Sequence, residues 1–159
     1  MNIKFASIDI DSDFSLCVEF RRDSYFCSFG TYIGYEDSII GYEQRMRKRS
    51  DDESSFCFHL WCDDEIVGQL EFRTFSDLPE TGYVNLVYVV PKYRGLGVAK
   101  RAQSFILNTL IINNCKNAIL SVSRTNHRAI NHYKRFGWKY FKPNPKHDIT
   151  DFYMCELGT

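Results

Sequence analysis

Apolar residues that return every three or four positions predict the helices of this chain. Such spacing follows Asp11 and Ser12, either of which can cap a first helix, and it returns over Glu36–Arg49. It is longest over residues 96–113. A shorter helix is expected over Asn126–Phe136, where a glycine follows the last apolar position. The pattern therefore predicts about four helices.

Runs of β-branched and aromatic residues predict the strands. Two of these runs form a hairpin, because the polar pair Asp63-Asp64 separates them. The run Leu86–Val90 is apolar at consecutive positions, which puts apolar side chains on both faces and predicts a central, buried strand. The expected strands cover residues 3–8, 56–61, 66–73, 82–90, 118–122, 138–141 and 152–156.

The order of these elements predicts a mixed α/β fold, with a central, largely antiparallel twisted sheet flanked by about four helices. The chain has 159 residues, of which 44% are hydrophobic, enough for one sizeable core but short for two domains. No repeat, low-complexity tract or flexible linker divides it. We therefore expect a single domain over residues 1–159.

The net charge and the hydropathy of the chain restrict the kinds of partner that we expect. Twenty basic residues balance twenty acidic ones, so the net charge favours neither nucleic acid nor a membrane surface as partner. Apolar runs such as Leu86–Val90 are too short to span a bilayer, and Met1–Phe5 lacks the apolar core of a signal peptide. The six cysteines are scattered and suggest no disulfide framework. These features predict a cytoplasmic protein.

A glycine-rich loop, Lys92–Lys100, lies between the central strand and the longest helix. Glycines let a phosphate approach the backbone, and free N–H groups at a helix N-terminus attract anions. The spacing differs from the P-loop pattern Gly-x4-Gly-Lys-Ser/Thr. A dinucleotide fingerprint starting at Gly95 would need a small residue where Lys100 stands. Taken alone, the loop is equally compatible with a tight connection that binds nothing.

The pattern that fits is Arg/Gln-x-x-Gly-x-Gly/Ala, matched by Arg94, Gly97 and Ala99 directly after an apolar strand that ends in proline. A second segment, Ser121–Trp138, contains Asn, Arg-Ala, Tyr and Gly-aromatic elements in register. Together these motifs resemble the GNAT superfamily of N-acetyltransferases, over roughly residues 56–141. The resemblance implies a GNAT-like fold and an enzyme that uses acetyl-CoA as co-substrate, without a metal, to acetylate an amine acceptor.

The resemblance also implies which residues hold acetyl-CoA. The backbone of Val87–Val89 is expected to pair with pantetheine, and the Val89 N–H is a candidate oxyanion donor. Asn126 and Tyr133 are seven residues apart and share a helix face; Asn126 helps to hold the pantetheine arm, and Tyr133 is the general acid for the sulfur. The expected cofactor-binding set is Val87, Tyr88, Val89, Arg94, Gly95, Leu96, Gly97, Val98, Ala99, Lys100 and Asn126.

The general base is less well defined, because Tyr83 stands where some family members carry a glutamate. If the adjacent strands pair, Gln69, Glu71 and Arg73 share a face with Tyr83 and Asn85. A polar cluster on an apolar layer suggests an acceptor pocket, and we hypothesise that Glu71 is the base, directly or through a water. Two alternatives stand: Glu71 pairs only with Arg73 on an exposed face, or solvent takes the proton.

Weaker signals have structural alternatives. The charged and aromatic residues 21–32 could flank the acceptor or form a solvated helix end. The basic run Arg45–Arg49 is typical of a solvated helix end, although it could meet an acidic acceptor or the CoA 3′-phosphate. Cys57 and His59 share a strand face from which Cys62 points away, so we expect no metal site.

Two histidines follow the start of the second motif without a recognisable catalytic spacing. His127 and His132 are five apart, which suits neither a helical metal pair nor a catalytic triad, and both are expected at the surface near the cofactor.

We expect a primary amine to attack directly in a ternary complex, but the acceptor can be a small molecule or a protein. A CoA-binding module without turnover is the alternative function. The late strands offer an open edge, so a homodimer is an option.

Overall fold

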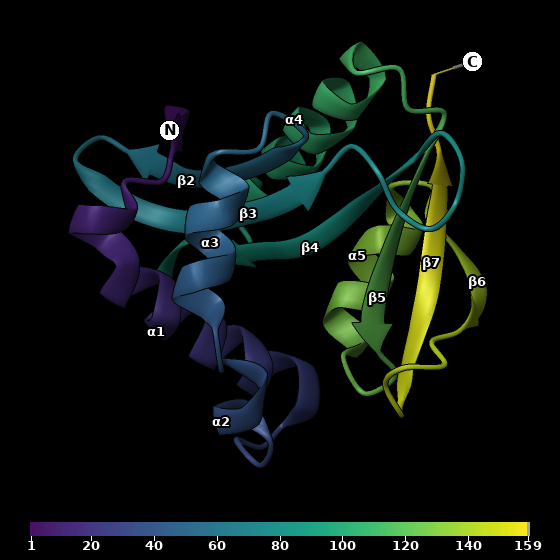
Figure 1. The fold of residues 1–159 in the computed structure, drawn as a ribbon, viewed down its shortest axis with the longest axis horizontal. Coiled ribbons are helices and arrows are strands. Elements are labelled where there is room, and N and C mark those ends of the chain that lie inside the picture. The colour runs from purple at the N-terminus through teal and green to yellow at the C-terminus, as the bar shows by residue number, and fades with distance from the viewer. Residues whose placement is uncertain (159) are drawn as a thin grey trace.

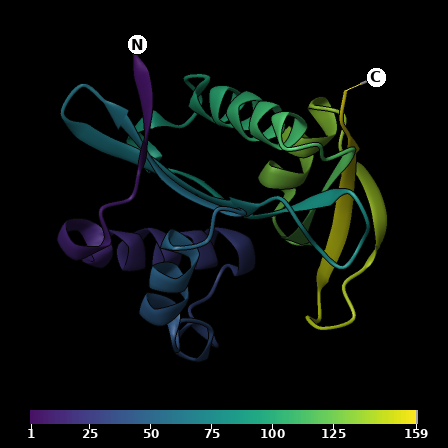
Figure 2. The same cartoon turned by 45° about the horizontal axis from the view of Figure 1, so that its top comes forward.

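The computed structural model describes residues 1–158. Its seven strands form one sheet in the order β1-β2-β3-β4-β5-β7-β6, in which β4 and β5 run parallel and the other neighbours antiparallel. Helices α1 to α3 cover one face of this sheet and α4 and α5 the other (Figures 1 and 2). This arrangement confirms the predicted α/β class. The elements are β1 (Ile3–Ser7), α1 (Ile10–Phe29), α2 (Tyr35–Ser38), α3 (Tyr42–Ser50), β2 (Ser55–Cys62), β3 (Glu65–Arg73), β4 (Thr81–Val89), a 3-10 turn (Pro91–Tyr93), α4 (Val98–Ile112), β5 (Asn117–Ser123), α5 (His127–Arg135), β6 (Lys139–Pro143) and β7 (Thr150–Glu156).

The N-terminal helices differ from their predicted boundaries. The single helix expected over Glu36–Arg49 is two helices, α2 and α3, because the chain takes a left-handed turn at Gly41 with φ of 74°. The first helix is capped by Asp9 rather than by Asp11 or Ser12, since the Asp9 carboxylate accepts a hydrogen bond from the Ser12 N–H at 3.2 Å.

Amphipathic packing holds α4 against the sheet. Its inward positions are fully buried, and they join the core formed by the central strands. The buried α4 side chains of this core are Val98, Ala102, Ile106 and Leu110. This packing fixes the first turn of α4 beside the end of β4, where the glycine loop begins.

The central strands β4 and β5 pair over a short distance and then part. Their register runs from Thr81 opposite Asn117 to Val84 opposite Leu120. At the next residue, Asn85, the register between β3 and β4 shifts, which is the pattern of a β-bulge. Because a bulge bends the strand that contains it, the remainder of β4 diverges from β5, and the two strands splay apart (Figure 1).

Candidate active site

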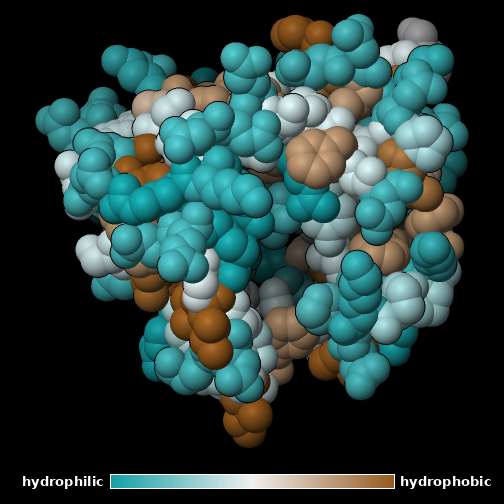
Figure 3. Space-filling model, in the orientation of Figure 1, coloured by the Kyte–Doolittle hydropathy of each residue, from teal (hydrophilic) through white to brown (hydrophobic). Residues whose placement is uncertain are grey.

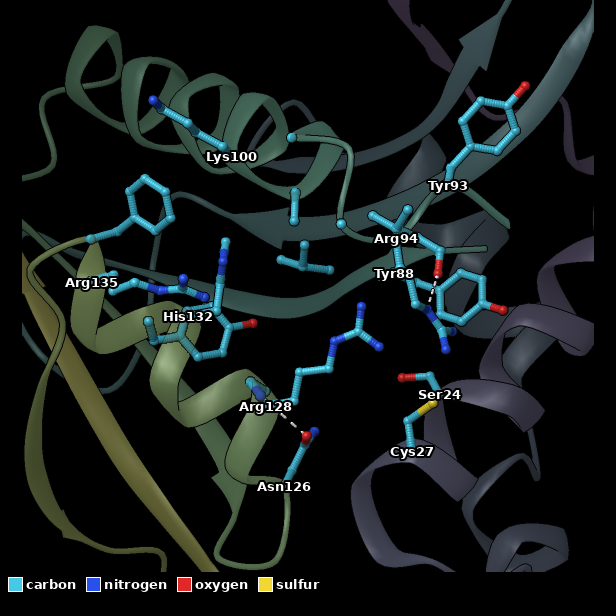
Figure 4. A pocket seen from close by; sticks show the side chains of 18 of the residues that line it. Ser24, Cys27, Tyr88, Tyr93, Arg94, Lys100, Asn126, Arg128, His132 and Arg135 are labelled. Atoms are coloured by element: carbon cyan, nitrogen blue, oxygen red, sulfur yellow. Dashed lines mark hydrogen bonds between the residues drawn. The ribbon is translucent and has the colours of Figure 1, made fainter. Parts of the chain in front are cut away.

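A cavity of about 490 Å³ lies in the opening between β4 and β5. Four parts of the chain surround it: the C-terminal half of α1, the end of β4, the glycine loop with the start of α4, and one face of α5 (Figure 4). The lining residues are Ser24, Cys27, Ser28, Val87, Tyr88, Val89, Tyr93, Arg94, Gly95, Gly97, Ala99, Lys100, Asn126, Arg128, Ala129, His132, Tyr133, Arg135 and Phe136.

The end of β4 presents an open backbone edge to this cavity. The Val90 N–H donates to the Val67 carbonyl at 2.9 Å. Because hydrogen bonds alternate along an antiparallel strand, the N–H groups of Val87 and Val89 point the other way, toward the side where β5 no longer pairs. The edge is therefore available to the amides of an extended ligand.

The glycine loop adds a cluster of free N–H groups beside that edge. Gly95 and Gly97 have φ of 78° and 85°, and Gly97 caps the N-terminus of α4. Apart from the adjacent residues of the chain, nothing lies within 4 Å of the position that a Cβ would take at either glycine. Leu96 is exposed and Val98 is buried in the core, so these two predicted contacts can offer only their backbone. The loop has room for a pyrophosphate.

The guanidinium of Arg94, a predicted cofactor-binding residue, is paired within the protein and holds neighbouring segments in place. Its Nε donates to the Val89 carbonyl at 2.8 Å, and its Nη2 forms an ion pair with Asp23 at 2.9 Å. The Tyr88 hydroxyl donates to the same carboxylate at 2.5 Å, and burial together with this bond raises the Tyr88 pKa. Arg94 thus ties the loop to β4 and to α1.

Asn126, the N-cap of α5, and Tyr133 on α5 both line the cavity. Asn126 caps the helix, with its side-chain oxygen accepting from the Ala129 N–H at 3.3 Å. The hydroxyl of Tyr133 is protonated at neutral pH, because burial raises its pKa to about 12. The helix thus brings an amide and a proton donor to one cavity.

The rest of the α5 face contains residues that sequence reasoning missed. The missed residues are Arg128 and Arg135; His132, which was expected at the surface near the cofactor, also lines the cavity and is half-buried. The His132 Nε2 is buried and has no hydrogen-bond partner among the described residues, and burial together with Arg135 lowers the His132 pKa. The spacing of Arg128, Ala129, His132, Tyr133 and Phe136 along one helix face could have indicated this side.

Comparison with known proteins identifies the family. A model of the acetyltransferase (GNAT) family matches residues 15–138. The chain belongs to the GNAT family. It is an N-acetyltransferase of the EC 2.3.1 class, and enzymes of this family use acyl-CoA. The comparison with curated proteins gave no match.

Solved structures show the same fold at low identity. The PaiA N-acetyltransferase of Thermoplasma acidophilum, crystallised with coenzyme A, is 15% identical and superposes over 99% of this chain and 100% of its own with a TM-score of 0.78. A GNAT-family acetyltransferase of Staphylococcus aureus is 17% identical over the same shares, with a TM-score of 0.82. An acetyltransferase of Thermus thermophilus is 18% identical over 99% and 98%, with a TM-score of 0.79.

The hypothesised base of this acetyltransferase, Glu71, lies outside the cavity. Its side chain is 1% exposed. Arg21 donates to one carboxylate oxygen at 2.7 Å and Arg49 at 3.1 Å, while Tyr42 donates to the other at 2.7 Å. Burial raises the Glu71 pKa most strongly, but the charge of Arg21 and the hydrogen bonds from Arg21, Tyr42 and Gln69 together hold the pKa below its usual value. The alternative pairing with Arg73 is not formed either.

Gln69 belongs to the same closed cluster and not to an acceptor pocket. Its amide nitrogen donates to Glu71 at 2.8 Å and to the Tyr42 hydroxyl at 3.0 Å, and its oxygen is 2.9 Å from the His59 Nε2. Since that oxygen accepts, His59 carries its proton on Nε2. The His59 Nε2 also lies 3.6 Å from the Cys17 sulfur. These contacts bind α1 and α3 to the sheet.

The other predicted acceptor residues are partly brought together. Arg73 lies opposite Tyr83, with its guanidinium 4.5 Å from the ring centroid. Asn85 sits at the bulge, outside the regular alternation. None of the three lines the cavity between β4 and β5.

Across residues 1–158, no group of three or more His, Cys, Asp or Glu side chains is placed to hold a metal ion. No helix in this part of the chain is long and apolar enough to cross a membrane.

Proposed function

We propose that this acetyltransferase moves the acetyl group of acetyl-CoA to a primary amine by direct attack in a ternary complex. One observation carries the proposal: the open edge of β4, the N–H groups of the glycine loop and the Tyr133 hydroxyl surround a single cavity. The backbone N–H and C=O groups at the β4 edge can form hydrogen bonds with the amides of pantetheine, and the N–H groups of the glycine loop can bind a pyrophosphate. The residues therefore fit acetyl-CoA.

The reaction requires charge stabilisation and two proton transfers. A neutral amine attacks the thioester carbonyl, the oxygen gains negative charge, and the carbon–sulfur bond then breaks. The Val89 N–H is the proposed donor to that oxygen, and Tyr133 gives its proton to the departing thiolate. A pKa of about 12 keeps Tyr133 in its protonated form until the thiolate forms.

We assign the amine proton to solvent rather than to a carboxylate. The residues that line the cavity include no Asp or Glu. Glu71 is enclosed by its own partners, so it has neither a free lone pair nor a path to the acceptor. This choice keeps the solvent alternative and drops Glu71 as base.

Calorimetry and a thiol-release assay test the proposal. Acetyl-CoA should bind the purified protein, and a panel of primary amines should reveal turnover. Tyr133→Phe should lower kcat by about 10²-fold or more while leaving acetyl-CoA affinity within about twofold, because it removes a proton donor and little contact area. Tyr140→Phe, an exposed tyrosine on β6, is the matched control.

The outcomes separate the two functional hypotheses. If neither acetyl-CoA nor CoA binds, the cavity assignment is wrong. If CoA binds but no amine in the panel releases thiol, the CoA-binding module without turnover is favoured. An unchanged kcat in Tyr133→Phe would overturn the acid assignment alone.

A further inference from the structure

A second, smaller cavity lies at the C-terminal end of α3, and it is rich in positive charge. Its volume is about 250 Å³. The residues around it are Lys48, Arg49, Asp52, Ser55, Arg73 and Phe75. They come from the last turn of α3, the start of β2 and the end of β3, so distant segments build it together.

Positive charge in this cavity exceeds the negative charge that could balance it. Among the described residues, Lys48 and Arg73 have no carboxylate within 4.0 Å. Arg49 shares the single carboxylate of Glu71 with Arg21. The Asp52 carboxylate already accepts from the Ser54 N–H at 2.9 Å and the Ser55 hydroxyl at 3.2 Å. An incoming anion would therefore find unpaired cations.

The guanidinium of Arg73 is held in place before any ligand arrives. It lies over the rings of Phe75 and Tyr83, at 5.1 and 4.5 Å from their centroids. Its Nε donates to the Phe75 carbonyl at 3.1 Å, which leaves the two terminal nitrogens free. Burial lowers the Arg73 pKa, the attraction of Tyr83 notwithstanding. A partly desolvated cation fixed in this way favours a bidentate anion.

The position of Arg73 relates this cavity to the reaction. Arg73 is directly opposite Tyr83, and Gly68, five residues before Arg73 on β3, is opposite Val89, the proposed oxyanion donor. At about 3.3 Å per residue, the two sites are about 17 Å apart along the strands. Figure 3 shows hydrophilic side chains over α3 and a hollow near the centre of the same face. An acceptor lying on this face could reach both sites.

We propose that Arg73, with Lys48 and Arg49, binds a carboxylate or phosphate group of the amine acceptor, about 17 Å from the amine that is acetylated. This inference rests on the proposed function and narrows the acceptor class to anionic amines. An extended chain of about five residues, or a small molecule of the same span, matches the distance. The basic end of α3 thereby has a role in selecting the substrate.

Matched acceptors test the distance and the charge together. The amidated peptides Ala-Ala-Ala-Ala-Glu and Ala-Ala-Ala-Ala-Gln differ in one charge, and an ω-amino carboxylate of equal span with its amide supplies the small-molecule arm. We expect kcat/KM to favour the acid by about tenfold, through KM, in at least one arm. Arg73→Gln should bring the acid-to-amide ratio close to one, and Arg73→Lys should recover part of it.

A binding measurement keeps the inference testable if none of these acceptors reacts. Inorganic phosphate should shift the Arg73 Nε–H resonance in ¹⁵N NMR along a saturable curve. Lys116→Gln, which removes an exposed cation elsewhere, is the control for net charge and should leave both results unchanged.

The experiments distinguish a failure of this inference from a failure of the proposed function. No preference for the acid in the wild type with turnover present, or an Arg73 resonance that phosphate leaves in place, would overturn this inference alone. Absence of acetyl-CoA binding would overturn the proposed function, whatever phosphate does at Arg73.

Discussion

Two polar regions of this acetyltransferase differ in how their hydrogen bonds are satisfied. Beneath α1 and α3, Glu71, Gln69, Tyr42 and Arg21 bond to one another in a closed cluster. Between β4 and β5, by contrast, the N–H groups of Val87 and Val89, those of the first turn of α4 and the His132 Nε2 have no partner in the described chain. Both regions contain buried polar groups, but the first leaves only the Arg21 Nε without a partner, whereas the second leaves a strand edge and a helix N-terminus open.

The difference separates a structural role from a binding role. A buried polar group that is fully bonded within the chain stabilises one arrangement of the helices and has nothing left for a ligand. A buried polar group without a hydrogen-bond partner destabilises the folded protein by its desolvation cost until a ligand bonds to it. Polarity and burial alone, which first suggested Glu71 as a base, do not make this distinction.

Removing the centre of the closed cluster should have the largest effect. Glu71→Gln leaves Arg21 and Arg49 without their anion. We expect the free energy of unfolding to fall by about 3 kcal/mol, near the lower end for a broken buried pair because both arginines are partly exposed. For a chain of this size that corresponds to a Tm about 10 °C lower, measured by thermal denaturation.

The same variant separates the roles of Glu71. Acetyl-CoA affinity should stay within about twofold of the wild type, and Glu43→Gln, which breaks an exposed pair on α3, should cost less than about 1 kcal/mol. Full stability with lost turnover would instead restore Glu71 as the base.

A substitution in the open region should act on the ligand as well as on the fold. Gly97→Ala and Gly137→Ala both place a side chain at positive φ with no neighbour within 4 Å, so each should cost about 1–2 kcal/mol of stability. Only Gly97 lines the cavity. Calorimetry should show CoA affinity about tenfold weaker in Gly97→Ala alone. Equal losses of affinity would mean that the loop does not contact the cofactor.

Acid should weaken both regions through their histidines. Burial lowers the pKa of His59 and of His132, so the unfolded chain takes up these protons at higher pH than the folded one. The free energy of unfolding should therefore fall as the pH drops below about 6.5. The lowered pKa of Glu71 keeps its contribution intact until more acidic pH.

Urea denaturation at about pH 7.5 and about pH 5.5, on either side of the ordinary histidine pKa, measures this dependence. His59→Gln should lose less stability between the two than the wild type, and the exposed His147→Gln should behave like the wild type. A pH dependence unaffected by His59→Gln would place the titrating group elsewhere.

The smallest effect is expected at the rim of the open region. Lys100 lines the cavity and has no ion-pair partner among residues 1–158. Lys100→Gln should weaken CoA binding about twofold to fivefold, and the difference should shrink at high salt because an exposed charge is screened. Lys116→Gln is the control, and a salt-independent loss would indicate a direct, buried contact instead.

The sequence was most informative where the determinants are local. The strand before Pro91, the glycines of the loop and the apolar spacing of α4 lie within about thirty residues, and each specifies its own backbone conformation. Asn126 is recognisable as a helix cap for the same reason. These segments build one side of the cavity and most of its backbone donors.

The closed cluster could not be predicted in this way. Alternation along β3 places Gln69 and Glu71 on one face, but what covers that face depends on Arg21, fifty residues away, and on Tyr42, whose position follows the break at Gly41. The bulge removed Asn85 from the expected alternation. Tertiary contacts of this kind leave no periodic signal in the sequence.

The short pairing of β4 with β5 has a thermodynamic consequence. Only the four residue pairs from Thr81 to Val84 join the strands, and beyond them a bound cofactor would supply the missing cross-connection. Ligand binding to the folded state is then linked to unfolding, adding about 2.7 kcal/mol when free ligand is about a hundredfold above Kd. The resistance of this protein to heat and proteases should therefore follow the concentration of acyl-CoA around it, so that its abundance reports on the supply of its own substrate.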